Sequence, residues 1–138
     1  MTHRFGLRSQ SNLIGVHPDL IAIAFKALEL SPVDFAITEG VRTVSRQREL
    51  FAQHKSQTLD SRHITGHAID VAAIRDGKIT WNWAEYETIA NAFKSAAMEL
   101  GIPLVWGGDW KTFKDGPHFE LSRKQYPAPR DATAGEQA

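Results

Sequence analysis

Two histidine-containing segments, far apart in the sequence, most constrain how this chain can fold. The first, residues 61–70, reads SRHITGHAID, and the second, residues 115–120, reads DGPHFE. Together they look like a split metal site, to which His63, Asp70 and His118 offer two imidazoles and one carboxylate. Zinc accepts this ligand set while a fourth position stays open for water, as in catalytic rather than structural zinc sites.

The same residues also have structural interpretations that involve no metal ion. Asp70 lies among apolar residues typical of a buried strand, where a carboxylate is costly unless it is paired or bound to a metal. A salt bridge to Arg42 or Arg62 would satisfy it. His118 is also flanked by apolar residues, and a single histidine there is more often a core residue than a ligand. The residues alone therefore leave metal binding and structural packing both open.

The composition limits the classes of protein to which the chain can belong. Its 138 residues are enough for one domain with one core. The 16 acidic and 16 basic residues balance, so the basic excess of a nucleic-acid-binding protein is missing. Without cysteine, a zinc site would have to use nitrogen and oxygen ligands. No apolar run approaches the roughly 20 residues of a membrane helix, and the N-terminus lacks the apolar segment of a signal peptide.

Hydrophobic periodicity and turn signals predict an α+β fold, in which a small antiparallel sheet is flanked by helices. Helical spacing predicts helices over 18–30 and 84–100, and Ser45 is the expected N-cap of a short helix that ends near His54. Alternating apolar residues and the Asp-Gly turn at 76–77 predict strands over 33–38, 67–74, 78–81, 104–106 and 118–121. Residues 1–16 show no clear period, and 107–116 are expected to form a loop.

We expect a single domain over residues 1–126. No large apolar residue follows Tyr126, and prolines punctuate the remaining segment. Residues 127–138 are therefore expected to form a disordered C-terminal tail.

The two histidine segments carry a specific pattern. Ser-x-His-x-x-Gly-x-Ala-x-Asp over 61–70, followed by Asp-x-x-His over 115–118, resembles the signature of the M15 zinc peptidases. This family includes D,D-carboxypeptidases, D-Ala-D-Ala dipeptidases and phage endolysins that act as L-alanyl-D-glutamate peptidases. Further segments resemble the endolysin branch most closely, and the likeness spans about residues 9–121. It implies a hedgehog/D,D-peptidase-like fold.

The resemblance implies roles for five residues at the centre of the site. His63, Asp70 and His118 would bind one zinc ion, and Asp115 would be the catalytic carboxylate. Arg42 would lie near the scissile carbonyl and stabilise the developing oxyanion. Each of the last two has an alternative. Asp115 lies in the turn-like run Lys-Asp-Gly-Pro, and Arg42 would otherwise be a surface residue or the partner of Asp70.

Other polar residues have weaker predicted roles. The resemblance places Ser61 and Gln47 near the substrate, although a loop cap for Ser61 and capping or packing for Gln47 are equally open. His67 is expected not to be a ligand, because residues 67 and 70 of a strand point to opposite faces. Asp109 or Glu120 could orient a ligand histidine from behind.

The expected function is that of a zinc-dependent endolysin, which hydrolyses the L-Ala–D-Glu bond in the peptidoglycan stem peptide for host cell lysis. The alternatives are a D,D-carboxypeptidase or D-Ala-D-Ala dipeptidase, and a zinc-containing wall-binding module without catalysis. We expect a monomer that binds peptidoglycan, binds no nucleic acid and does not insert into membranes. It would be made in the host cytoplasm and would reach the wall in the periplasm after holin-dependent release.

Overall fold

The computed structural model describes residues 3–127, so the predicted tail lies outside the described residues from 128 onwards. Along this part of the chain the helices are α1 (Leu7–Asn12), α2 (Pro18–Leu30), α3 (Val44–Ala52), α4 (Trp83–Leu100) and the 3-10 turn η1 (Gly107–Asp109). The strands are β1 (Asp34–Glu39), β2 (Ala68–Arg75), β3 (Lys78–Thr80), β4 (Leu104–Trp106) and β5 (His118–Leu121). The α+β prediction is confirmed.

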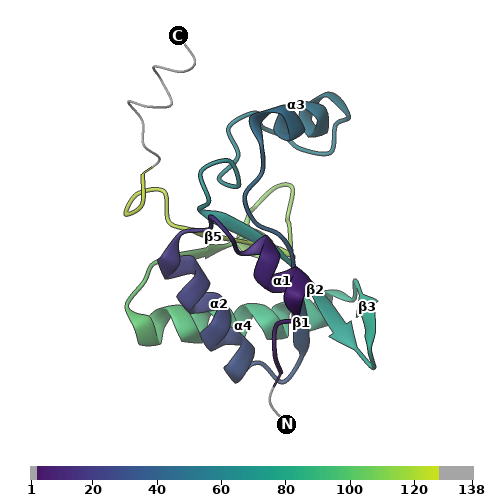
Figure 1. The fold of residues 1–138 in the computed structure, drawn as a ribbon, viewed down its shortest axis with the longest axis vertical. Helices are drawn as coiled ribbons and strands as arrows, with labels where there is room; N and C mark the ends of the chain where they lie inside the picture. Colours follow the sequence, from purple (N-terminus) through teal and green to yellow (C-terminus); the bar gives the residue numbers. More distant parts are fainter. Residues whose placement is uncertain (1–2, 128–138) are drawn as a thin grey trace.

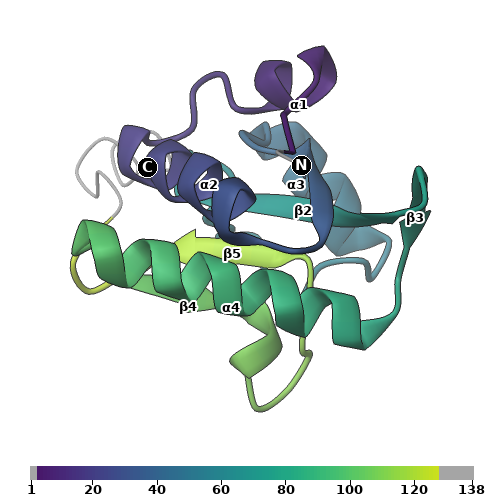
Figure 2. The same cartoon turned by 90° about the horizontal axis from the view of Figure 1, so that it is seen from below.

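The strands form one antiparallel sheet with the order β1-β2-β5-β4, and β3 pairs with β2 through the hairpin at Asp76 and Gly77. Helices α2 and α4 lie together against one face of the sheet, and α3 lies on the other side (Figures 1 and 2). The apolar core fills the space between the sheet and α2 and α4. Among residues 3–127, no helix is long and apolar enough to cross a membrane.

The pairing of β2 with β5 sorts their side chains into two faces. Ile69 lies opposite Phe119, and both are fully buried in the core. Because successive residues of a strand point to opposite faces, the next pair, Asp70 and His118, points away from the core. The polar face of the sheet is therefore created by the same register that builds the apolar face.

Local sequence signals set the ends of the helices. Pro18 begins α2, and the preceding His17 caps it by accepting a hydrogen bond from the Asp19 N–H at 3.0 Å. Gly101 ends α4 with φ +71°, as expected for a C-terminal glycine. The predicted N-cap of α3 was wrong by two residues: Thr43, not Ser45, accepts the hydrogen bond from the Arg46 N–H.

Two short elements were not predicted. Helix α1 lacks an apolar period, and contacts with β1 hold it in place: Ser9 Oγ accepts from the Ile37 N–H at 3.0 Å, and Asn12 donates to the Ile37 carbonyl at 2.8 Å. The turn η1 falls in the predicted loop. Helix α1 depends on contacts that are distant in sequence, which is why a local pattern missed it.

Gly66 is needed where the chain turns into β2. Its φ is +77°, and an added Cβ would lie 2.6 Å from the Gly15 carbonyl oxygen. We expect Gly66→Ala to lower the free energy of unfolding by about 3 kcal/mol, measured by chemical denaturation. Gly77→Ala is the matched control, because φ there is +76° but the space around it is open. The control should cost only about 1 kcal/mol, and equal losses for the two variants would contradict the role of the close contact.

Candidate metal centre and cleft

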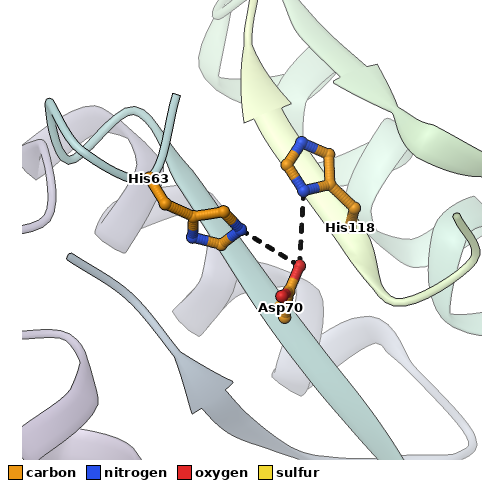
Figure 3. A group of neighbouring side chains, drawn as sticks. All are labelled: His63, Asp70 and His118. Carbon is orange, nitrogen blue, oxygen red and sulfur yellow. Dashed lines mark hydrogen bonds and ion pairs between the residues drawn. The ribbon is translucent and has the colours of Figure 1, made fainter. Parts of the chain in front are cut away.

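Three side chains from separate segments converge on the polar face of the sheet. His63 comes from the loop before β2, Asp70 from β2 itself and His118 from the start of β5 (Figure 3). Their ligand atoms all lie within 4.8 Å of one another. The structure thus brings together the three residues that the sequence proposed as a split metal site.

In each imidazole, the nitrogen that points away from Asp70, which we call the outer nitrogen, has a hydrogen-bond acceptor that holds its proton. His63 Nδ1 lies 2.9 Å from the Gly40 carbonyl oxygen, which can only accept, so Nδ1 carries the hydrogen. His118 Nε2 lies 2.7 Å from the Glu120 carboxylate and donates to it in the same way. In neutral imidazoles this leaves His63 Nε2 and His118 Nδ1 as bare lone pairs.

Both bare nitrogens face the same oxygen. His63 Nε2 and His118 Nδ1 each lie 3.3 Å from Asp70 Oδ1. Three electron-rich atoms that converge in this way need a cation between them. Two imidazole nitrogens and one carboxylate oxygen are ligands that zinc accepts, and histidine ligands held from behind by a carbonyl or a carboxylate are typical of metal sites. The donor set therefore fits a divalent metal ion such as zinc.

The charges of the cluster agree with a site built for a cation. Burial alone would lower the pKa of His118, but its hydrogen bonds to Asp70 and Glu120 outweigh burial and raise the pKa to about 9. Burial would raise the pKa of Asp70, whereas its contacts with His118 and His63 hold it well below the usual range. Asp70 is thus anionic, and a proton on His118 would occupy the place that a metal ion would take.

Arg42 lies next to the cluster and is held in place. Its guanidinium donates to Gln47 Oε1 at 2.7 Å and to Glu39, and Nη2 lies 3.8 Å from Asp70 Oδ2. Arg42 is therefore also an ionic partner of Asp70, as the alternative interpretation proposed. It approaches Oδ2, whereas the two imidazoles approach Oδ1. Arg42 also lines the cleft.

Asp115 lies in the turn before β5. Its backbone forms the turn, with its N–H donating to the Gly107 carbonyl at 3.0 Å and its carbonyl accepting from the His118 N–H at 3.2 Å. Its side chain lines the cleft and has no hydrogen bond to the residues that the structure describes. Burial and the charge of Asp70 raise the pKa of Asp115, against the opposing effect of His118, His63 and Arg42. A carboxyl group that takes up a proton more readily than usual suits acid–base chemistry.

The two residues predicted to contact substrate have different surroundings. Ser61 lines the cleft, but its Oγ also accepts from the His63 N–H at 3.2 Å, so it caps the loop that carries His63. Gln47 is fully buried and does not line the cleft. It holds Arg42 and the carbonyl of Thr58. For Gln47 the packing alternative therefore replaces substrate contact.

The neighbouring polar residues take separate roles. His67 forms a hydrogen bond with Thr65 Oγ1 at 2.6 Å, and its ring lies 5.5 Å from the His17 ring, outside the cluster. Of the two carboxylates proposed to orient a ligand histidine, Glu120 forms a hydrogen bond with His118, whereas Asp109 pairs with Lys94 at 2.7 Å.

Sequence reasoning missed two groups that hold the site. The Gly40 carbonyl orients His63, and no side-chain pattern could reveal a backbone acceptor. Arg62 is buried behind Glu120, with Nε 3.9 Å from its carboxylate, and donates to the carbonyls of Leu121 and Tyr126. It appeared in the sequence only as a possible partner of Asp70.

The cluster opens onto a cleft of about 1250 Å³. One wall is formed by α3 and the loop after it, with Arg46, Lys55 and Thr58, and the other by the loop between η1 and β5. The site combines two histidines and a carboxylate with a second carboxylate, Asp115, whose side chain forms no hydrogen bond within residues 3–127, and with an anchored arginine. This combination defines the class of metal-dependent hydrolases.

Comparison with known proteins agrees with this class and narrows it. The family model of the phage L-alanyl-D-glutamate peptidases matches residues 1–130, and the chain belongs to this family. It is 43% identical over 130 residues to the L-alanyl-D-glutamate peptidase of Escherichia phage T5, covering 91% of this chain and 94% of that protein.

Solved structures agree on the fold. The crystal structure of the Serratia marcescens L-Ala D-Glu endopeptidase ChiX superposes with a TM-score of 0.88 at 52% identity, covering 92% of this chain and 96% of that chain. The vancomycin-resistance D,D-dipeptidase VanXYg shares the fold, with a TM-score of 0.51 at 14% identity over 86% of this chain and 58% of that chain. The predicted D,D-peptidase-like fold is thus confirmed.

The Glu120 hydrogen bond should strengthen metal binding. We expect Glu120→Gln to weaken zinc affinity by roughly 10- to 100-fold, because the amide no longer supports the charge on His118. Competition with a chromophoric chelator measures this affinity. Asp109→Asn is the control, since Asp109 pairs with Lys94 instead. Unchanged affinity in Glu120→Gln would contradict the proposed support of His118.

Proposed function

We propose that this protein is a zinc peptidase that hydrolyses the L-alanyl–D-glutamate bond in peptidoglycan stem peptides, with His63, Asp70 and His118 as the ligands of one zinc ion. The observation that carries the proposal is the convergence of His63 Nε2 and His118 Nδ1 on Asp70 Oδ1. The substrate is supported by the names of the two relatives that match nearly the whole chain, the phage T5 peptidase and ChiX.

When bound, zinc would polarise the scissile carbonyl and lower the pKa of a water molecule to near 7. Asp115 accepts a proton from the attacking water as the water oxygen bonds to the carbonyl carbon. It then donates this proton to the nitrogen as the carbon–nitrogen bond breaks, so that the glutamate amine leaves neutral. The raised pKa of Asp115, caused by burial and by Asp70, favours this temporary protonation.

Arg42 would stabilise the negative charge that develops on the carbonyl oxygen. Its guanidinium is already oriented by Gln47 and Glu39, so little reorganisation is needed when the charge appears. Ser61, whose Oγ caps the His63 loop, is proposed to bond the substrate at the edge of the cleft.

The alternatives have less support. A D,D-carboxypeptidase or dipeptidase rests on a likeness to VanXYg at 14% identity, which concerns the fold. A wall-binding module without catalysis would not need the carboxylate of Asp115, free of hydrogen bonds to the described residues, in the cleft.

The resemblance to endolysins also suggests how the protein reaches its substrate. We propose that it is a monomer made in the host cytoplasm, that a holin releases it, and that it acts on the wall in the periplasm.

Asp115 is the central test of the mechanism. We expect Asp115→Asn to reduce kcat by about 10²- to 10⁴-fold, because the amide cannot carry the proton. Cleavage of purified peptidoglycan is followed by mass spectrometry, and zinc content should stay at one ion per chain. Asp109→Asn, on the surface, is the control. Full activity of Asp115→Asn would show that another group is the base, and release of free D-alanine alone would rule out the proposed bond.

Metal removal tests the cofactor. Dialysis against a chelator should abolish activity and lower the thermal midpoint, because a ligand that binds only the folded state stabilises it. One equivalent of zinc should restore both. A chain that keeps activity after complete metal removal would contradict the zinc assignment.

A further inference from the structure

The cleft is cationic although the chain as a whole is neutral. Its acidic lining residues are Glu39, Asp70, Asp115 and Glu120, and twice as many lining residues are basic. Three of the four acids are already engaged: Glu39 with Arg42, and Asp70 and Glu120 with the imidazoles. A cleft with this excess of positive charge attracts an acidic ligand.

One stretch of the cleft wall is fixed to the metal cluster at both ends. Residues 110–114 begin at Trp110, whose ring lies 5.1 Å from the His118 ring, and end immediately before Asp115. The N–H groups of Trp110 and Asp115 both donate to the Gly107 carbonyl, at 3.2 and 3.0 Å. This five-residue segment, which we call the 110–114 loop, therefore has a defined position beside the site.

Phe113, at the tip of the 110–114 loop, has an unfavourable conformation. Its φ is +52°, in the left-handed region that costs a bulky residue roughly 1–2 kcal/mol. The residue is 70% exposed and lines the cleft, so packing within the described structure does not offset this cost. Strain of this kind is typical of ligand-binding segments.

The ammonium groups of the two lysines in this loop, Lys111 and Lys114, have hydrogen-bond donors available for a ligand. Lys114 Nζ donates to the Gly108 carbonyl at 3.4 Å, which holds the ammonium group and leaves two of its hydrogens free. Lys111 forms no ion pair with the residues that the structure describes. On other parts of the lining, Arg46 pairs with Glu49 and Arg123 with Asp60.

The chemistry of the proposed reaction indicates which part of the substrate lies beside these two lysines. Asp115 hands its proton to the leaving amine, so the residue that supplies this amine lies on the Asp115 side of the cleft. In the proposed substrate that residue is a glutamate, whose free carboxylate is close to the amine. The 110–114 loop directly precedes Asp115 and offers two ammonium groups at this place.

We propose that Lys111 and Lys114 bind the carboxylate of the acidic residue on the amine side of the cleaved bond, while Phe113 packs against the peptide. The inference rests on the proposed function and names the residues that set its specificity. It makes the 110–114 loop the subsite for the leaving residue.

The test compares two synthetic stem peptides, one with the free glutamate carboxylate and one with a carboxamide in its place. The zinc-loaded wild type should prefer the carboxylate peptide by about fivefold in kcat/KM, the upper range for an exposed ion pair. The double variant Lys111→Met, Lys114→Met should lose this preference, because its kcat/KM falls more for the carboxylate peptide than for the carboxamide peptide. Methionine keeps the apolar length of the side chain, and thermal midpoints verify folding.

The matched control is Lys55→Met, Lys124→Met, which removes two lysines from other parts of the cleft lining. It should keep the wild-type preference. Equal cleavage of both peptides by the wild type, or loss of the preference in the control instead, would overturn the inference and leave the proposed function standing. Failure of the wild type to cleave the Ala–Glu bond in either peptide would overturn both.

Discussion

The antiparallel register between β2 and β5 is the constraint on which the site depends. It sets Asp70 opposite His118 on the polar face and Ile69 opposite Phe119 in the core. A slip by one residue would move every side chain of the strand to the other face. The buried apolar pair therefore enforces the register, and the register brings together two of the three side chains that could hold a metal ion.

Around this pair, a backbone carbonyl and a carboxylate determine which nitrogen of each imidazole carries a proton. The Gly40 carbonyl and the Glu120 carboxylate hold the outer hydrogens of the two imidazoles, so both inner nitrogens face Asp70. Arg62, only 3% exposed, balances Glu120 and ties the end of β5 to the chain that follows. The polar cluster is thus oriented for a cation before one binds, which reduces the cost of organising it.

Much of this arrangement could be predicted from the sequence. The helices and strands carry strong periodic patterns, and β2, β3, α4 and β5 lie within a residue or two of their predicted positions. The motifs that contain His63, Asp70, His118 and Asp115 identified the family, and the resemblance predicted these four residues for the centre of the site. Periodicity and turn residues act within a short stretch of chain, whereas the family resemblance joins two motifs that lie far apart in the sequence.

Only the tertiary structure decided the rest. It showed that Glu120 rather than Asp109 supports His118, that Gln47 is buried behind Arg42, and that a backbone carbonyl orients His63. It also ordered α1 through Ser9 and Asn12. The sequence by itself determined which chemical groups are available and which face of each element is apolar. Which groups meet depended on strand register and packing, because those contacts join residues far apart in the chain.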